Sequence, residues 1–179
     1  MKALIVVDMQ HDFTYGKFRN ERAIEIIDKI NKVIAIFRRK KLPIIFTRDA
    51  HIKHDKEFEI WGEHAVKGTA GYELAKGLDF RKNDMVINKR SYDAFFNTDL
   101  DGILREKNVK DIFICGIATH VCVLHTVAGA FFRGYRTYII RDCITSFDER
   151  WHELGIEYMK KIFKSEVINH FEIEKFIKQ

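Results

Sequence analysis

The sequence lacks most of the features that mark secreted, membrane-spanning or multidomain proteins. Its three cysteines are an odd number without the regular spacing of a disulfide framework, which favours a reducing compartment. No apolar run approaches the roughly 18 residues of a membrane-spanning helix, and the N-terminal residues do not form a secretory signal. One proline and no low-complexity tract leave no mark of a domain boundary. We therefore expect a single, soluble, cytoplasmic domain over residues 1–179.

An excess of one charge is also absent over most of the chain. The 31 Lys and Arg residues are interleaved with 26 Asp and Glu residues, so the net charge of +5 is spread out. This pattern argues against a nucleic-acid or membrane partner. Hydrophobic residues make up 46% of the chain, enough to bury one core without help from disulfides or metals.

Short apolar runs alternate with helical patterns. The runs lie at residues 3–7, 44–47, 85–87, 112–115, 137–140 and 166–169, and the helical patterns at 23–37, 100–107, 121–132, 151–163 and 171–177. Strands that are apolar on both faces and alternate with helices are typical of a parallel sheet covered on each side. We predict a three-layer α/β/α, Rossmann-like domain with a six-stranded, mainly parallel sheet. The long segment 49–71 has no clear period, and its histidine and tryptophan content indicates a functional loop.

Residues that can carry chemistry follow the predicted strands. Asp8, Lys89 and Cys122 come after the first, third and fourth strands, whose carboxyl ends share one edge of a parallel sheet. Cys122 falls in the predicted first turn of a helix, where free N–H groups lower the pKa of a thiol. Asp8 could take its proton, and Lys89 could stabilise the charge. The alternative is that Cys122 is a core residue, Asp8 a helix cap and Lys89 a surface residue.

A metal site is a second possibility at the same edge. Asp49 and His51 are two residues apart, so an extended backbone points both side chains the same way, and His64 could return from the long loop as a third ligand. The same residues would also suit a solvated loop. Three further candidates for a fourth ligand are not ranked by the sequence: His54, Asp55 and Glu57.

Five segments resemble the isochorismatase-like cysteine hydrolases and, among them, the nicotinamidases. They are ALIVVDMQ at 3–10 followed by Asp12 and Phe13, TRDAH at 47–51, WGEHAVKGT at 61–69, NKRSYDAF at 88–95 and CGIATHVCV at 115–123. Each is weak alone, but their order and spacing together are specific. The resemblance covers the chain from its start to about Ser146.

The resemblance implies a catalytic triad in which Asp8 is base and then acid, Lys89 stabilises charge and Cys122 is the nucleophile. It implies a cis peptide bond between Ile117 and Ala118, with the N–H groups of Ala118 and Cys122 forming an oxyanion hole. The substrate would be a small amide hydrolysed through a thioester.

The resemblance also implies a divalent metal ion, Zn²⁺ or else Mn²⁺ or Fe²⁺, held by Asp49, His51 and His64. Three residues would contact the substrate ring: Phe13, Trp61 and Ile117. A homo-oligomer, either a dimer or a tetramer, is implied as well. His120, beside the nucleophile, we expect at the surface or at a subunit contact.

Nicotinamide, converted to nicotinate and ammonia, is the expected substrate. An N-carbamoylsarcosine-type amidohydrolase would keep the triad but need an anion-binding Arg or Lys in place of the metal. Isochorismatase itself needs no thiol, and a non-catalytic binding protein would be expected to lack a triad residue. A redox-sensing thiol is disfavoured because Cys115 and Cys143 have expected core positions.

Overall fold

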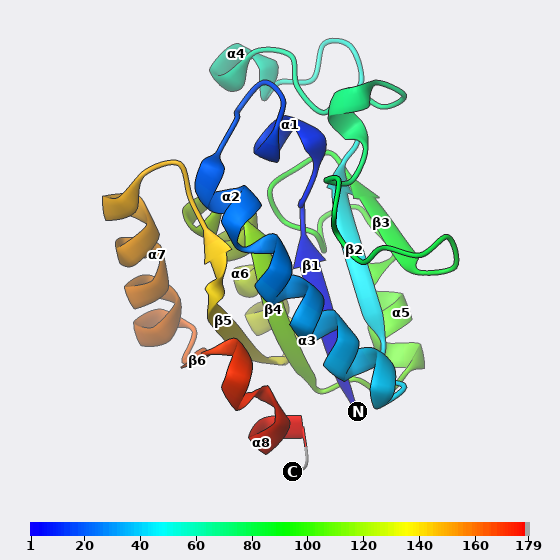
Figure 1. The fold of residues 1–179 in the computed structure, drawn as a ribbon, viewed down its shortest axis with the longest axis vertical. Coiled ribbons are helices and arrows are strands. Elements are labelled where there is room, and N and C mark those ends of the chain that lie inside the picture. Colours follow the sequence, from blue (N-terminus) through cyan, green and yellow to red (C-terminus); the bar gives the residue numbers. More distant parts are fainter. Residues whose placement is uncertain (178–179) are drawn as a thin grey trace.

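The computed structural model describes residues 1–177 and has one six-stranded sheet (Figure 1). The strands are β1 (Lys2–Val7), β2 (Ile44–Asp49), β3 (Met85–Lys89), β4 (Asp111–Ile117), β5 (Arg136–Thr145) and β6 (Glu166–Ile168). Their order is β3-β2-β1-β4-β5-β6, and every neighbouring pair is parallel. The predicted six strands are confirmed, in a wholly parallel sheet.

Helices cover both faces of the sheet. They are α1 (His11–Thr14), α2 (Glu21–Glu25), α3 (Ile27–Arg39), α4 (Phe58–Trp61), α5 (Leu100–Glu106), α6 (Leu124–Phe132), α7 (Glu149–Ile162) and α8 (Ile173–Ile177). Figure 1 shows α3 in front of the sheet and α5 and α6 behind it. None of the helices within residues 1–177 is long and apolar enough to cross a lipid bilayer.

The side chains of β1 alternate between the two faces of the sheet, and each face has its own hydrophobic core. Leu4 and Val6 pack with the buried side of α3, whereas Ile5 and Val7 pack with α5, α6 and α7 on the other face. Since both faces of the strand are covered, the strand has no polar face. The predicted three-layer α/β/α domain is confirmed.

Several local features differ from the sequence-based prediction. The predicted helix at 23–37 is divided at Ile26 into α2 and α3, and α7 begins two residues before Trp151 because Asp148 caps it through the N–H of that residue. The short helices α1 and α4 escaped prediction because four residues are too few to establish a period.

Gly116 brings β1 and β4 close together near their carboxyl ends. It has a φ of +116°, and a Cβ atom there would lie 2.0 Å from the carbonyl oxygen of Val7. Only glycine fits this backbone conformation and spacing. The close approach lies where the sheet order reverses between β1 and β4, the usual place for a site in an open parallel sheet.

The long segment after β2 is ordered and folds over this edge, seen at the top of Figure 1. It pairs with itself through a parallel bridge between His51 and Val66. The buried side chain of Gln10 ties it down, because its amide nitrogen donates to the carbonyl oxygens of Asp49 and Tyr72, each at 2.9 Å. The segment is therefore held in a fixed place above the strand ends.

Candidate active site

The carboxyl ends of β1 and β3 and the turn after β4 bring three predicted site residues together. Lys89 is buried at the end of β3, with its Nζ atom 2.7 Å from Asp8 Oδ2 and 3.5 Å from Cys122 Sγ. Asp8 follows β1 with a φ of 47°, and the hydroxyl of Thr47 donates to its Oδ1 atom at 2.6 Å. The acid, the amine and the thiol are adjacent, as the order of the strands predicts.

Lys89 is the charged centre of this group. Its ammonium also lies 2.5 Å from Asp49 Oδ1 and donates to the carbonyl oxygen of Ser91 at 2.9 Å. Burial alone lowers the pKa of a lysine, but Asp49 and Asp8 together raise the pKa of Lys89 well above its ordinary value. Burial raises the pKa of Asp8 to about 6, an effect that Lys89 opposes and Asp49 reinforces. Lys89 stays positive, whereas Asp8 can exchange a proton near neutral pH.

Cys122 differs from its sequence-based prediction in two ways. It lies in a wide π-helical turn, Thr119–Val123, and α6 begins only after that turn. Burial raises the pKa of its thiol well above the ordinary value, although Lys89 lowers it. Burial, reinforced by Asp8 and Asp49, therefore works against the thiolate that we expect a helix N-terminus to favour. A base beside the thiol, such as Asp8, would help to ionise it.

The backbone before Cys122 has the form that the resemblance implies. The peptide bond between Ile117 and Ala118 is cis. The carbonyl oxygen of Ala118 accepts hydrogen bonds from the N–H groups of Val121 and Val123, at 3.0 and 3.2 Å, and not from that of Cys122 between them. The oxyanion hole formed by the N–H groups of Ala118 and Cys122 stays a prediction.

The three predicted metal ligands lie beside the triad. Asp49, His51 and His64 are all buried, and each offers one ligand atom within 4.8 Å of those of the other two. The Nε2 atom of His51 is buried, has no hydrogen-bond partner among the described residues, and lies 3.9 Å from Asp49 Oδ2. A buried nitrogen without a partner is costly unless something binds it. The donor set of one carboxylate and two imidazoles suits Zn²⁺ and similar ions.

The other ring nitrogen of each histidine is already used. Nδ1 of His51 lies 2.9 Å from Asp55 Oδ2, and Nδ1 of His64 lies 2.8 Å from the carbonyl oxygen of Gly62. Metal-binding histidines usually donate their second N–H in this way. Burial lowers the pKa of His64, which favours the neutral form that binds metals. The residues therefore fit a divalent ion.

The candidates for a fourth ligand can now be separated. His54 is exposed, and Asp55 faces Nδ1 of His51 rather than the cluster. Glu57 has its Oε2 atom 3.8 Å from His51 Nε2. Burial, reinforced by Asp49, raises the pKa of Glu57 to about 7. Of the three, Glu57 is the one beside Nε2 of His51, but it lies outside the group of Asp49, His51 and His64, whose ligand atoms are within 4.8 Å of one another.

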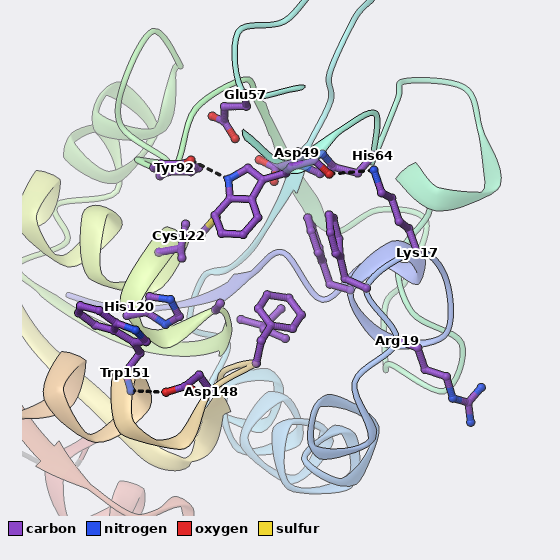
Figure 2. A pocket seen from close by; sticks show the side chains of 17 residues that line it. Lys17, Arg19, Asp49, Glu57, His64, Tyr92, His120, Cys122, Asp148 and Trp151 are labelled. Atoms are coloured by element: carbon purple, nitrogen blue, oxygen red, sulfur yellow. Dashed lines mark hydrogen bonds between the residues drawn. The ribbon is translucent and has the colours of Figure 1, made fainter. Parts of the chain in front are cut away.

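A cavity of about 630 Å³ opens onto both halves of the site (Figure 2). Its wall includes Cys122 on one side and Asp49 and His64 on the other. All three residues predicted to contact a substrate ring also lie in the wall: Phe13, Trp61 and Ile117. The volume is within the usual range for a site that binds a small molecule.

Some of the wall was not predicted from the sequence. Phe18 stacks on Phe13 with ring centroids 5.9 Å apart, and Tyr92 accepts a hydrogen bond from Trp61 Nε1 at 2.8 Å. Tyr92 follows Lys89 by three residues, so its proximity to the strand end was a usable signal. His120, expected at the surface or at a subunit contact, lies in the cavity wall, with its ring centroid 5.8 Å from that of Trp151.

Comparison with known proteins agrees with this architecture. The isochorismatase domain family matches residues 2–170. Nicotinamidase 3 of Arabidopsis thaliana is 30% identical over 158 residues, which cover 84% of this chain and 76% of that protein.

Two solved structures are similar over nearly the whole chain. N-carbamoylsarcosine amidase from Thermoplasma acidophilum has a TM-score of 0.90 at 33% identity, covering 97% of this chain and 98% of its own. Pyrazinamidase of Pyrococcus horikoshii, solved in complex with zinc, has a TM-score of 0.88 at 34% identity, covering 94% and 98%. The protein therefore belongs to the isochorismatase family of hydrolases.

Proposed function

We propose that the protein hydrolyses a small amide, nicotinamide, to nicotinate and ammonia. The observation that carries the proposal is the shared cavity, in which the thiol of Cys122 and the ligand cluster of Asp49 and His64 face one aromatic-walled space. A planar ring with a ring nitrogen at one end and an amide at the other suits such a space. The names of the nicotinamidase and pyrazinamidase relatives support the same substrate class.

In the proposed reaction, Asp8 takes the thiol proton as Cys122 Sγ attacks the amide carbon. Lys89 stabilises the developing negative charge from its position 3.5 Å from the sulfur. The C–N bond then breaks, and Asp8 returns its proton to the leaving ammonia. Asp8 next takes a proton from a water molecule that attacks the thioester, which releases the acid, and its proton goes back to the thiol.

The metal ligands would be Asp49, His51 and His64, with Glu57 beside His51. A bound divalent ion would take the ring nitrogen of the substrate and so orient its amide toward the thiol. Phe13 and Trp61 would hold the faces of the ring, together with Ile117. The oxyanion would be held by the N–H groups of Ala118 and Cys122.

An N-carbamoylsarcosine-type substrate is the second candidate, supported by the similarity to that amidase. Its carboxylate would need a cation, and the cavity wall contains Lys17 and Arg19. Lys17 Nζ already donates to the carbonyl oxygens of Trp61 and Glu63, at 2.8 and 2.7 Å, and Arg19 pairs with Glu21 at 2.7 Å. The pair of Arg19 with Glu21 is exposed and weak, whereas the two bonds of Lys17 leave it less free to bind a carboxylate, which favours nicotinamide.

The protein is also proposed to work in the cytoplasm as a homo-oligomer. Three buried, unpaired thiols at Cys115, Cys122 and Cys143 suit a reducing compartment. An exposed apolar face on α7 suits self-association.

Ammonia release tests the function. Purified protein would be given nicotinamide or N-carbamoylsarcosine, after metal removal and after zinc is restored. We expect nicotinamide turnover that zinc restores and that Cys122→Ala abolishes. The matched control is Cys143→Ala, a buried cysteine outside the site, which should keep its activity. Turnover of only the carbamoyl compound would contradict nicotinamide as the substrate and favour the second candidate. No turnover of either compound would contradict the proposed function.

A further inference from the structure

A second ion pair lies directly behind the metal-ligand cluster. The carboxylate of Asp55 accepts from three different groups: His51 Nδ1 and the N–H of Ile52 bond to its Oδ2 atom at 2.9 and 3.1 Å. Arg90 Nε reaches the same oxygen at 3.2 Å, and Arg90 Nη2 bonds to Oδ1. Both oxygens of the carboxylate therefore accept hydrogen bonds, and two nitrogens of the arginine bond to it.

The burial of these three side chains is uneven. The imidazole of His51 is fully buried and Asp55 is only 6% exposed, whereas Arg90 is 56% exposed. A buried carboxylate is costly without a partner, and Arg90 supplies that partner from the solvent side. Within this pair, Asp55 contacts the buried histidine and Arg90 is exposed to solvent.

The chemistry of this contact places a hydrogen on Nδ1 of the histidine. A carboxylate accepts hydrogen bonds and cannot donate them, so the hydrogen between Asp55 and His51 is on Nδ1. A neutral imidazole with hydrogen on Nδ1 has its lone pair on Nε2. That atom faces Asp49 and Glu57 and has no partner among the described residues.

We propose that Asp55, held in place by Arg90, is a positioning residue that presents Nε2 of His51 to the metal ion. This inference rests on the proposed metal-dependent function and assigns to Asp55 a role distinct from that of a ligand. Asp55 sets the tautomer and the ring angle of His51, while Arg90 sets the place of the carboxylate.

The same pair links the two halves of the site. Arg90 follows Lys89 at the end of β3, and Asp55 lies in the long segment after β2. Asp49 and Lys89 join these elements on the inner side, and Asp55 and Arg90 join them on the outer side. The metal-binding segment is therefore held to the strand that carries the catalytic lysine.

Zinc binding to metal-free protein tests this role without any measurement of activity. Asp55→Asn should weaken zinc binding by about 10- to 100-fold, the usual effect of removing a partner of a metal-bound histidine. Arg90→Gln should weaken it less, and because the arginine is exposed this variant should fold. Long-range ¹H–¹⁵N spectra of the metal-free protein should show hydrogen on Nδ1 of His51, and Asp55→Asn should change that signature.

The matched control is Asp111→Asn. Arg136 Nε lies 2.5 Å from Asp111 Oδ1, and this pair is likewise an exposed arginine over a carboxylate that is 7% exposed. It lies at the amino end of β4, away from the site, so the substitution should leave zinc affinity unchanged. Unchanged affinity in Asp55→Asn, or an equal loss in Asp111→Asn, would overturn the positioning role alone. Absence of zinc binding by the unsubstituted protein would contradict the proposed metal site and the positioning role together.

Discussion

Lys89 is the common partner of two buried carboxylates, so we expect it to contribute to the stability of the fold, which Cys122 does not. Replacing it in Lys89→Met leaves Asp8 and Asp49 without their common partner. We expect a loss of about 3–5 kcal/mol in the free energy of unfolding, together with loss of turnover, because an uncompensated buried charge is costly. Urea denaturation and ammonia release measure the two effects.

Cys122→Ala is the comparison for that experiment. It removes a small buried side chain, and we expect it to abolish turnover while changing the free energy of unfolding by about 1 kcal/mol or less. If both variants were equally stable, Lys89 would not be the electrostatic centre of the site.

The identities of the site residues were largely predictable from the sequence, but their electrostatics were not. Asp8, Lys89 and Cys122 each follow a strand, and the parallel sheet brings such positions to one edge. The high pKa of the Cys122 thiol depends on burial and on carboxylates that come from other strands. Glu57 comes into the site through the long segment after β2, and Phe18 through the connection between α1 and α2. Neither stretch has a periodic pattern from which its path could be predicted.

At the scale of single elements, the end of β4 requires a glycine at position 116. Gly116→Ala would place a Cβ atom 2.0 Å from the carbonyl oxygen of Val7, in a backbone conformation that alanine rarely adopts. We expect it to lower the free energy of unfolding by about 3 kcal/mol or more. Thermal unfolding of the purified variant measures this loss of stability. A variant that does not fold at all would also agree with the expectation.

Gly102 provides the opposite case for the same measurement. It lies inside α5, and a Cβ atom there would meet nothing within 4 Å. Gly102→Ala should therefore stabilise the protein by roughly 0.5–1 kcal/mol. Equal effects from the two substitutions would contradict the close approach of β1 and β4.

An ion pair joins α3 to the segment before β3, and its contribution to stability should depend on pH. Arg38 bonds to both oxygens of Asp84, each at 2.7 Å, and both side chains are largely buried. Burial by itself raises the pKa of Asp84, but the bonds from Arg38 and from the N–H of Arg81 more than offset it and hold the pKa below its usual value. The pair therefore contributes stability above about pH 4, where an unfolded aspartate is ionised, and loses it as pH falls through the lower folded pKa.

Asp84→Asn tests this dependence. Relative to the unsubstituted protein, it should lose about 1–3 kcal/mol at about pH 7, and this difference should shrink as the pH is lowered below the folded pKa. Urea denaturation over that pH range measures it. Asp99→Asn, at an exposed cap position without a side-chain cap bond, should show no such trend. A difference that stays constant with pH would argue against the ion pair.

Element types were easier to predict than element ends. Apolar runs and helical spacing identified all six strands and five helical regions, because burial on both faces of a sheet leaves a strong pattern. The break between α2 and α3 at Ile26 and the π-helical turn before α6 have no such pattern. The cis peptide bond at Ile117 came from family resemblance alone.

At the scale of the whole molecule, exposed apolar side chains gather along α7 and at the end of α6. Four side chains on α7 are spaced by three or four residues and point to solvent: Trp151, Leu154, Tyr158 and Ile162. Phe131 and Phe132 at the end of α6 adjoin them through contacts with Phe163. These exposed side chains amount to about 600 Å², if each has roughly 200 Å². This area is at the upper end of the apolar patches found on monomeric proteins. It is also near the area that each partner buries in a stable protein–protein interface.

We expect the protein to self-associate through this face. A double variant, Leu154→Glu with Tyr158→Glu, should shift it to monomers in sedimentation velocity while its folded spectrum is kept. Phe171→Glu, at an aromatic residue outside the face that is more exposed than Leu154 or Tyr158, should leave the assembly unchanged. A monomeric unsubstituted protein would contradict the expectation.

The shared carboxylate of Asp49 has a consequence for how such a site can change during evolution. One oxygen belongs to the lysine of the triad, and the other faces the histidines of the ligand cluster. Exchange of His51 or His64 would remove a predicted metal ligand and leave the contact between Asp49 and Lys89 intact, whereas exchange of Asp49 would remove a predicted ligand and a partner of Lys89 in one step. We therefore expect a descendant that lost the proposed metal site stepwise to keep Asp49.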